Sequence, residues 1–142
     1  IDKFSGQVSG ESIIEKNQVE IKEIFEQENI EEILNKTYSL SQNGSEFSKN
    51  TEHELKGKSP TSLKITFKQI HMATEMSLRD ALIMEYRMVQ RCQASGDFYE
   101  GVRAMLVDKD RNPQWKPSNL DKVDEIWVNH FFEPLHEKDL KI

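Results

Sequence analysis

The sequence is poor in the residues that build disulfide frameworks, thiolate metal sites, membrane spans and cationic surfaces. It has one cysteine, Cys92, in 142 residues, which excludes an internal disulfide and a cluster of thiolate ligands. It has no run of about 18 apolar residues, the length that a membrane-spanning helix needs. Only 19 lysines and arginines stand against 25 aspartates and glutamates, for a formal net charge of −6. We therefore expect no direct nucleic-acid partner and no membrane partner, because both need a cationic face.

Motifs for catalysis and for metal binding are also missing. No two of the four histidines have the i, i+4 spacing that places two metal ligands on one helix face. The sequence has no glycine-rich phosphate loop and no Gly-x-Ser-x-Gly elbow. Its acidic pairs, such as Glu31-Glu32, fall at expected helix starts, where carboxylates favour the positive end of the helix dipole. The residues alone therefore predict no catalytic residue, no metal site and no bound cofactor.

Helical spacing of apolar residues runs along almost the whole chain, and no segment alternates as a strand does. The expected fold class is all-α, an irregular bundle of about six or seven helices. We expect Asn43-Gly44 and Ser95-Gly96 to end helices, and residues 45–57 to form a short helix or a loop. The expected helix starts carry capping residues: Ser12 with Glu15, Asn29, Ser59 before Pro60, Ser77 with Asp80, Asp97 with Glu100, and Ser118 or Asp121.

Each expected helix should bury the apolar face that its spacing defines. The side chains expected on these faces are Ile14, Ile21, Ile24 and Phe25; Ile30, Ile33, Leu34, Thr37 and Tyr38; Leu63, Thr66, Phe67 and Ile70; Leu78, Ala81, Leu82, Glu85, Tyr86, Val89 and Cys92; Val102, Met105 and Leu106; and Val123, Ile126, Trp127, Phe131 and Phe132. Cys92 is thus expected to be a buried, inert thiol. Gly101 is unusual, because a glycine inside a helix costs about 1 kcal/mol relative to alanine. We expect another group to approach that helix closely at Gly101.

Charge divides the chain into two parts. Residues 1–58 hold 12 acids and 7 bases, whereas residues 59–142 hold 13 and 12. We expect an acidic, solvated N-terminal helical segment over 1–58. Residues 59–142 carry more apolar side chains than short helices bury among themselves, so we expect this part to dock on a partner. The chain opens at Ile1 without a methionine or a signal-like segment, and we expect a processed or truncated piece.

One motif connects the chain to a known family. Residues 97–104, Asp-Phe-Tyr-Glu-Gly-Val-Arg-Ala, resemble the Asp-x-x-Glu-Gly-Val-x-Ala motif of the crotonase superfamily, which a basic turn with a proline follows. That turn is represented here by Lys109, Arg111 and Pro113. A closer resemblance is to 3-hydroxyisobutyryl-CoA hydrolases, strong over 59–142 and weaker over 10–58. The matching segments are residues 59–66, 84–87, 97–110, 115–117, 129–131 and 139–141.

The resemblance implies an activity for a larger protein. Members of this family cleave the thioester of 3-hydroxyisobutyryl-CoA in valine breakdown, which places the protein in the mitochondrial matrix. In that family the backbone amides of a glycine-containing turn in the N-terminal core form an oxyanion hole. A glutamate and an aspartate of the same core handle water and protons. None of those motifs is present in this chain, so we expect it to be inactive alone.

For this chain the resemblance implies the role of a C-terminal helical cap. The cap packs over an upstream crotonase-like core, in the same or a separate chain, helps to close the acyl-CoA pocket and contributes to subunit contacts. If so, the group expected near Gly101 is the backbone of that core. The resemblance also makes Lys109 and Arg111 candidates for contact with the CoA phosphates. For these two residues a solvated turn remains the alternative.

Two other functions remain open at this stage. The chain fits a non-catalytic hydrolase-like structural subunit, for example of a mitochondrial ribosome, where its acidity would limit it to protein contacts. It also fits a free-standing helical adaptor. A partner core that carries the oxyanion-hole glycines and the acid pair would favour the hydrolase, and a core without them would favour the structural subunit.

Overall fold

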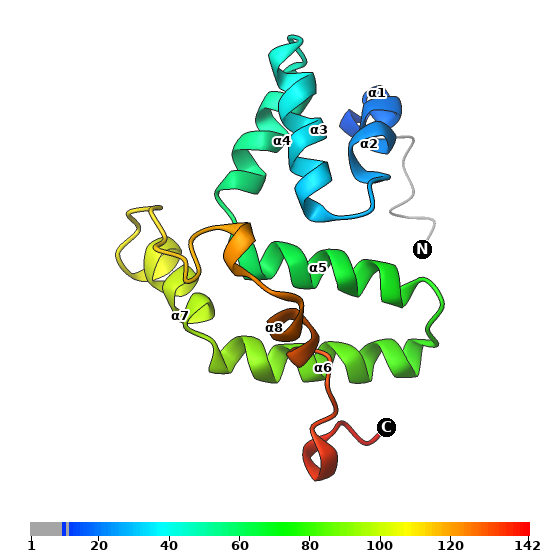
Figure 1. Cartoon of the computed structure of the whole chain (residues 1–142), viewed down its shortest axis with the longest axis vertical. Helices are drawn as coiled ribbons and strands as arrows, with labels where there is room; N and C mark the ends of the chain where they lie inside the picture. Colours follow the sequence, from blue (N-terminus) through cyan, green and yellow to red (C-terminus); the bar gives the residue numbers. More distant parts are fainter. Residues whose placement is uncertain (1–9, 11) are drawn as a thin grey trace, which may run out of the picture. The chain divides into compact units, whose positions relative to one another are not determined.

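The computed structural model describes residues 10 and 12–142, and within these residues it contains helices and loops and no strand (Figure 1). The all-α fold is confirmed. The chain divides into two compact units, Ile1–Glu52 and His53–Ile142, with the boundary inside α4. The elements in chain order are α1 (Ile13–Lys16), α2 (Gln18–Phe25), α3 (Ile30–Gln42), α4 (Glu46–Lys56), α5 (Pro60–Ala73), α6 (Leu78–Ala94), α7 (Gly96–Val102), η2 (Arg103–Val107), η3 (Leu120–Lys122), α8 (Glu125–His130) and η4 (His136–Lys138).

The helix starts of the first unit follow the capping residues of the sequence. The Ser12 hydroxyl accepts the Glu15 amide at 3.0 Å, while the Ser12 amide donates to the Glu15 carboxylate at 2.9 Å. The Asn29 side chain accepts the Glu32 amide at 2.8 Å and caps α3. Both expected caps are confirmed, because a cap depends only on residues three positions apart. Asn43 ends α3, as expected.

Polar side chains hold α4 to the other helices of the first unit. Residues 46–56 are a helix, so of the two expectations for this segment the helix is confirmed. Ser48 is fully buried, and its hydroxyl donates to the Glu20 carboxylate of α2. The Ser41 hydroxyl of α3 donates to Glu52 at 2.5 Å. The spacing of apolar residues over 46–56 was a weak signal for a helix, because side-chain hydrogen bonds of Ser48 and Glu52 attach α4 to α2 and α3.

The apolar face of the first unit is narrower than its spacing predicted. Ile24 is completely buried, and Ile30, Ile33 and Thr37 are at most 6% exposed. Ile14, Phe25 and Tyr38 were expected on the same faces, but they are 69%, 42% and 52% exposed. Their assignment to the core was wrong.

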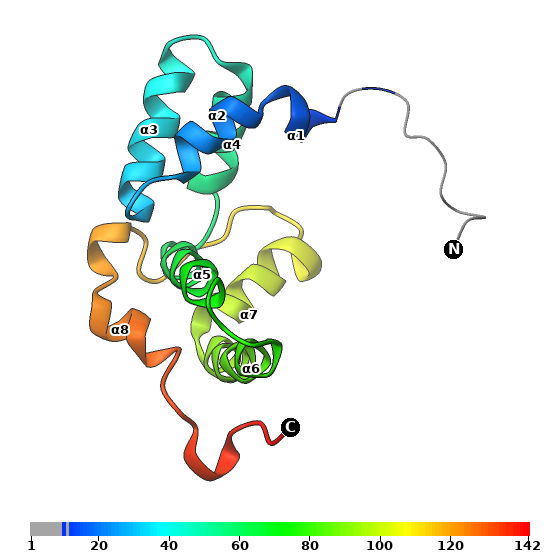
Figure 2. The same ribbon diagram turned by 90° about the vertical axis from the view of Figure 1, so that its right-hand side faces the viewer.

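An α5–α6 hairpin forms the frame of the second unit (Figure 1). Ser59 caps α5 by accepting the Ser62 amide at 3.1 Å, with Pro60 in the first turn, where its missing N–H costs nothing. Ser77 caps α6 by accepting the Asp80 amide at 3.1 Å. Seen nearly end-on in Figure 2, α5 and α6 lie next to each other, and α8 contacts α5.

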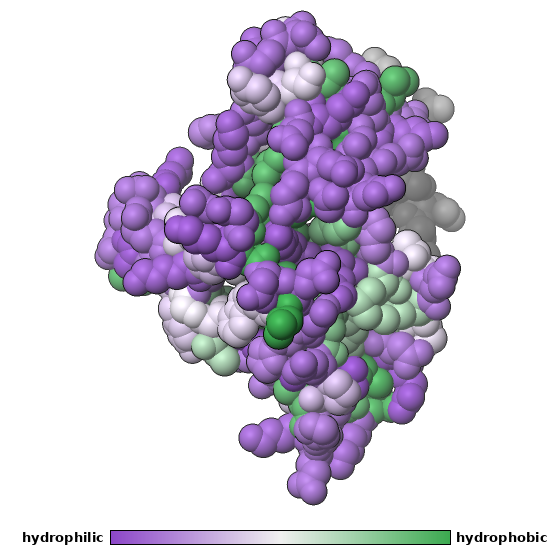
Figure 3. All heavy atoms as spheres, in the orientation of Figure 1, coloured by the Kyte–Doolittle hydropathy of each residue, from purple (hydrophilic) through white to green (hydrophobic). Residues whose placement is uncertain are grey.

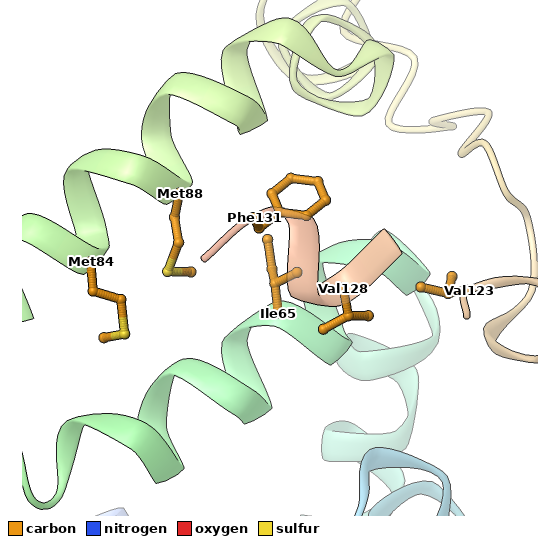
Figure 4. Packing of buried hydrophobic residues seen from close by; sticks show 6 residues of the cluster. All are labelled: Ile65, Met84, Met88, Val123, Val128 and Phe131. Atoms are coloured by element: carbon orange, nitrogen blue, oxygen red, sulfur yellow. The ribbon is translucent and has the colours of Figure 1, made fainter. Parts of the chain in front are cut away.

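The core of this unit gathers residues from α5, α6 and the segment around α8 (Figure 4). Its buried members are Ile65, Met84, Met88, Val123, Val128 and Phe131. The predicted faces of α5 and α6 were partly wrong. Ile65 was not on the predicted α5 face, and Ile70, which was, is 60% exposed. On α6 the two methionines are buried, whereas Leu78, Leu82 and Val89 are 77%, 42% and 48% exposed.

Two predicted helix starts in the second unit were also wrong. Ser95, not Asp97, precedes α7, and the Asp97 carboxylate makes no cap. The last α-helix begins at Glu125, where Asp124 accepts the Trp127 amide at 2.7 Å, so neither Ser118 nor Asp121 caps it. Residues 120–122, just before it, form a short 3-10 turn instead. On α8 Ile126 is 82% exposed, although it was expected in the core.

Candidate functional site

The basic loop that the sequence singled out, residues 108–117, follows α7 and the π-helical segment η2 (drawn in yellow in Figure 1). Lys109 and Arg111 are exposed on it. Both have left-handed backbone conformations, with φ of 57° and 54°. Such values are uncommon for residues other than glycine. The loop therefore has a defined backbone shape that its surroundings must stabilise.

Arg103, in the first position of η2, binds three carboxylates around this loop. Its guanidinium forms a bidentate pair with Glu100, with nitrogen–oxygen distances of 2.8 and 2.9 Å. Its Nη1 donates to Asp108 at 2.6 Å and to Asp110 at 2.7 Å. The Arg103 side chain is 32% exposed, so water screens these pairs only in part. The planar five-donor guanidinium suits several carboxylates at once.

The ionisation of this cluster follows from these hydrogen bonds. The Arg103 guanidinium, aided by the Gln114 amide, lowers the pKa of Glu100 from 4.5 to about 2. The carboxylates of Glu100, Asp110 and Asp108 in turn raise the pKa of Arg103. Arg103 and the Asn112 amide lower the pKa of Asp110. At neutral pH Glu100, Arg103 and Asp110 are therefore all charged.

Backbone amides attach the loop to the helix before it. The Arg111 amide donates to the Ala104 carbonyl at 3.1 Å, which anchors the loop at its tip. The Gln114 amide donates to the Glu100 carboxylate at 2.6 Å. Glu100 therefore binds both the Arg103 guanidinium and the Gln114 amide, and it holds the end of the loop against α7.

Trp115 packs against Gly101 of α7. A Cβ atom on Gly101 would lie 3.3 Å from the Trp115 ring. The indole N–H donates to the Gly57 carbonyl at 3.0 Å, so the ring is held from its other edge. The expected close approach at Gly101 is confirmed. The group that approaches in the structure is this chain's own Trp115, whereas the expected approach of a partner's backbone stays a prediction.

Asp97 connects the start of α5 to the end of the loop. Its carboxylate accepts the Ser59 hydroxyl at 2.5 Å and the Lys116 amide at 2.9 Å. The sequence predicted a local capping box for Asp97. It did not indicate either of the observed partners, which lie 38 and 19 positions away. The Arg103 cluster was also missed. The spacing of Glu100 and Arg103, three residues apart on a helix, was an available signal for their pair.

The side chains of Lys109 and Arg111 form no ion pair or hydrogen bond with any other residue among 10 and 12–142. The structure thus brings both residues to one exposed loop, and their role as phosphate contacts stays a prediction.

Burial raises the pKa of the Cys92 thiol, which is only half-buried. No group of metal-ligating side chains occurs among the described residues, and no helix in that part of the chain has the length and hydropathy of a membrane span.

An apolar surface is the second candidate feature of this unit. Leu78, Leu82 and Val89 lie along one face of α6, since positions 4 and 7 residues apart share a helix face. Met105 and Leu106 of η2 are 55% and 68% exposed. Figure 3 shows one side of the molecule, on which hydrophobic residues form separate green areas between hydrophilic ones. These side chains are among the exposed apolar groups of residues 53–142.

Comparison with known proteins gives this geometry a context. The sequence model of a family described as enoyl-CoA hydratase/isomerase matches residues 1–132. Similar curated proteins include the mitochondrial 3-hydroxyisobutyryl-CoA hydrolases of Gallus gallus, 42% identical over 93% of this chain, and of Homo sapiens, 41% identical over 91%. The aligned parts cover 34% and 33% of those proteins. The chain spans about a third of the length of the curated relatives that it matches.

Solved structures agree with these relatives. A carnitinyl-CoA dehydratase from Mycobacterium thermoresistibile is 26% identical, with a TM-score of 0.85 over 95% of this chain and 38% of its own. An enoyl-CoA hydratase from Rhodobacter sphaeroides is also 26% identical, with a TM-score of 0.86 over 98% of this chain and 40% of its own. Two enzymes whose names include acyl-CoA compounds thus contain the same helical arrangement, and it makes up 38% and 40% of their chains.

Proposed function

The chain belongs to the enoyl-CoA hydratase/isomerase family, and we propose that it is the C-terminal part of an acyl-CoA thioester hydrolase of the 3-hydroxyisobutyryl-CoA hydrolase type. The observation that carries the proposal is the 40–43% identity to hydrolases of that name over most of this chain. Their names include the word mitochondrial. We extend the proposal to valine degradation in the mitochondrial matrix.

The proposed role of this chain is to cap and assemble the enzyme, without a catalytic residue of its own. The hydrolases that it resembles are about three times as long as their aligned parts. We assign the oxyanion hole and the acid pair to a core outside residues 1–142. Donors that stabilise the developing oxyanion are the largest catalytic contribution in such chemistry, so the isolated chain should not accelerate hydrolysis.

The proposed partner of the apolar surface is that core. Leu78, Leu82 and Val89 are more exposed than the neighbouring Met84 and Met88, although all five belong to the same helix. Burying apolar surface stabilises an interface by about 25 cal/mol per Å². A docked core would thus bury the apolar side chains that this unit leaves exposed. Contacts between whole subunits are a further use of the same surface.

Lys109 and Arg111 are the proposed contacts to the CoA phosphates. They are exposed and make no ion pair with the rest of the described chain, so they are free to bind an anion. Guanidinium and ammonium groups are the side chains that recognise phosphates best. No cofactor is part of the proposal; acyl-CoA is the substrate of the whole enzyme.

The test is an intact mass of the protein in its source, followed by an assay of that protein. We expect a mass roughly three times that of this chain, or a stable complex with a second chain that supplies the core. The purified species should hydrolyse 3-hydroxyisobutyryl-CoA. A source protein of 16.6 kDa without a core partner, or a core-containing species without hydrolase activity, would contradict the proposal.

A further inference from the structure

The order of charges at the tip of the basic loop is unfavourable for binding an anion. Residues 108–111 read Asp-Lys-Asp-Arg, so each cation has a carboxylate next to it in the sequence. In a free loop these neighbours would pair with each other and leave little positive charge for a ligand. In the structure they do not pair.

Arg103 pairs with the two aspartates that lie next to the cations in the sequence. Its Nη1 atom binds the Asp108 carboxylate at 2.6 Å and the Asp110 carboxylate at 2.7 Å. Both acids turn toward this one guanidinium, and Lys109 and Arg111 make no ion pair within the described part of the chain. The loop thus separates its charges, with the carboxylates around Arg103 and the two cations exposed.

The backbone holds this separation in place. Lys109 and Arg111 both have positive φ, a conformation that persists only where the surroundings stabilise it. The Arg111 amide bonds to Ala104 and the Asn112 amide to the Asp110 carboxylate, at 3.1 and 2.9 Å. Because the two cations are two residues apart, their Cα atoms are at most about 7 Å apart. Both can therefore reach phosphate groups of one ligand.

Charge counting limits how such a loop can act. Arg103, Lys109 and Arg111 balance Glu100, Asp108 and Asp110, so the six groups together carry no net charge. Long-range attraction of an anion is therefore weak, and salt screens it beyond a Debye length of about 8 Å. Binding of an anion therefore depends on direct contact with Lys109 and Arg111. That contact requires Asp108 and Asp110 to be held away from these two cations.

We propose that Arg103 is a positioning residue for phosphate recognition: by binding Asp108 and Asp110 it keeps them off Lys109 and Arg111, which then contact the phosphates of the adenosine part of an acyl-CoA. The inference rests on the proposed function, which supplies the acyl-CoA. Arg103 does not touch the ligand. Its effect passes through the two aspartates.

The experiment measures the affinity of the natural, full-length protein for adenosine 3′,5′-bisphosphate by calorimetry. Lys109→Ala with Arg111→Ala should abolish binding, and Arg103→Ala should weaken it on the order of tenfold, the loss of about one charged contact. Adding Asp108→Asn and Asp110→Asn to Arg103→Ala should restore the affinity, because the two carboxylates next to the cations in the sequence are then gone, while Glu100 still accepts the Gln114 amide. A purely structural role of Arg103 would not be rescued in this way.

Two further variants guard against misfolding. Asp108→Asn with Asp110→Asn, in the presence of Arg103, should bind at least as tightly as the natural protein. Lys122→Ala, which removes an exposed cation of η3, should leave binding unchanged. The inference is overturned if the natural protein does not bind the bisphosphate, if Arg103→Ala binds equally well, or if the aspartate substitutions fail to restore binding.

A kinetic comparison separates this inference from the proposed function. Arg103→Ala should raise KM for the CoA thioester and leave kcat unchanged, and it should leave KM unchanged for a pantetheine thioester, which lacks the adenosine phosphates. Equal effects on both thioesters contradict the role of Arg103 and leave the hydrolase proposal standing. Absence of any thioester hydrolysis, with bisphosphate binding that depends on Arg103 as described, contradicts the hydrolase and leaves the phosphate loop standing.

Discussion

The Trp115 ring lies 3.3 Å from the point that a Cβ atom on Gly101 would occupy, and its indole N–H bonds to the Gly57 carbonyl. The ring is therefore held on two sides and cannot move freely away from α7. This contact explains the glycine inside the helix by the chain's own packing. The residue at position 101 thus affects the stability of this chain directly.

Gly101→Leu should lower the free energy of unfolding by about 1–3 kcal/mol, the usual cost of overpacking. Gly101→Ala is the matched control. Its gain in helix propensity, about 1 kcal/mol, offsets the small displacement of Trp115, so its stability should stay close to that of the natural chain. Urea unfolding followed by circular dichroism checks both. A leucine variant as stable as the alanine variant would show that Trp115 does not restrict position 101.

Ser59 and Asp97 should be energetically coupled. Ser59→Ala and Asp97→Ala each remove their hydrogen bond, which has an oxygen–oxygen distance of 2.5 Å, together with other bonds. A double-mutant cycle isolates the shared contribution, which we expect to be about 1 kcal/mol. Strictly additive effects would contradict the bond. Asp97 would then contribute to stability only through the Lys116 amide.

Acid should weaken the loop through Glu100. Its pKa is lowered from 4.5 to about 2 by Arg103, so its contribution to stability is fully present above pH 4.5 and is lost as the pH falls toward 2. A carboxyl titration by NMR should show this low pKa, and Arg103→Gln should return it toward the ordinary range. A Glu100 pKa near 4.5 in the natural chain would contradict the pairing.

Two faces of α6 should respond differently to truncation in the purified chain. Met84→Ala should lower stability by about 2–5 kcal/mol, since the side chain is buried. Leu82→Ala, on the exposed face, should change it by about 0.5 kcal/mol or less, and should instead weaken association with the core. Equal destabilisation by both variants would argue that the exposed face is already covered within this chain.

Much of the fold could be predicted from the sequence where the cause is local. The caps formed by Ser12, Asn29, Ser59 and Ser77 each depend on an amide three residues away, and all four were predicted. The cap predicted for Asp97 was wrong, because the hydrogen-bond partners of its carboxylate are distant in the sequence. A short-range pattern gives no information about such contacts.

The choice of buried face could not be made from periodicity alone. Several helices here are apolar on more than one side, and spacing does not say which side the chain covers itself. On α6 the structure buries Met84 and Met88 and leaves Leu78 and Leu82 exposed. The resemblance located Lys109 and Arg111 on a candidate site, but the charge separation around them depends on contacts that only the structure shows.

The most direct test of the account compares the hydrolysis of 3-hydroxyisobutyryl-CoA by the natural protein and by purified residues 1–142 alone. We predict turnover by the natural protein and, for the isolated chain, a rate equal to that of buffer, because we assign the oxyanion hole and the acid pair to the core. Turnover by the isolated chain that survives stringent purification would contradict it. So would a natural protein that contains the core and leaves the thioester intact.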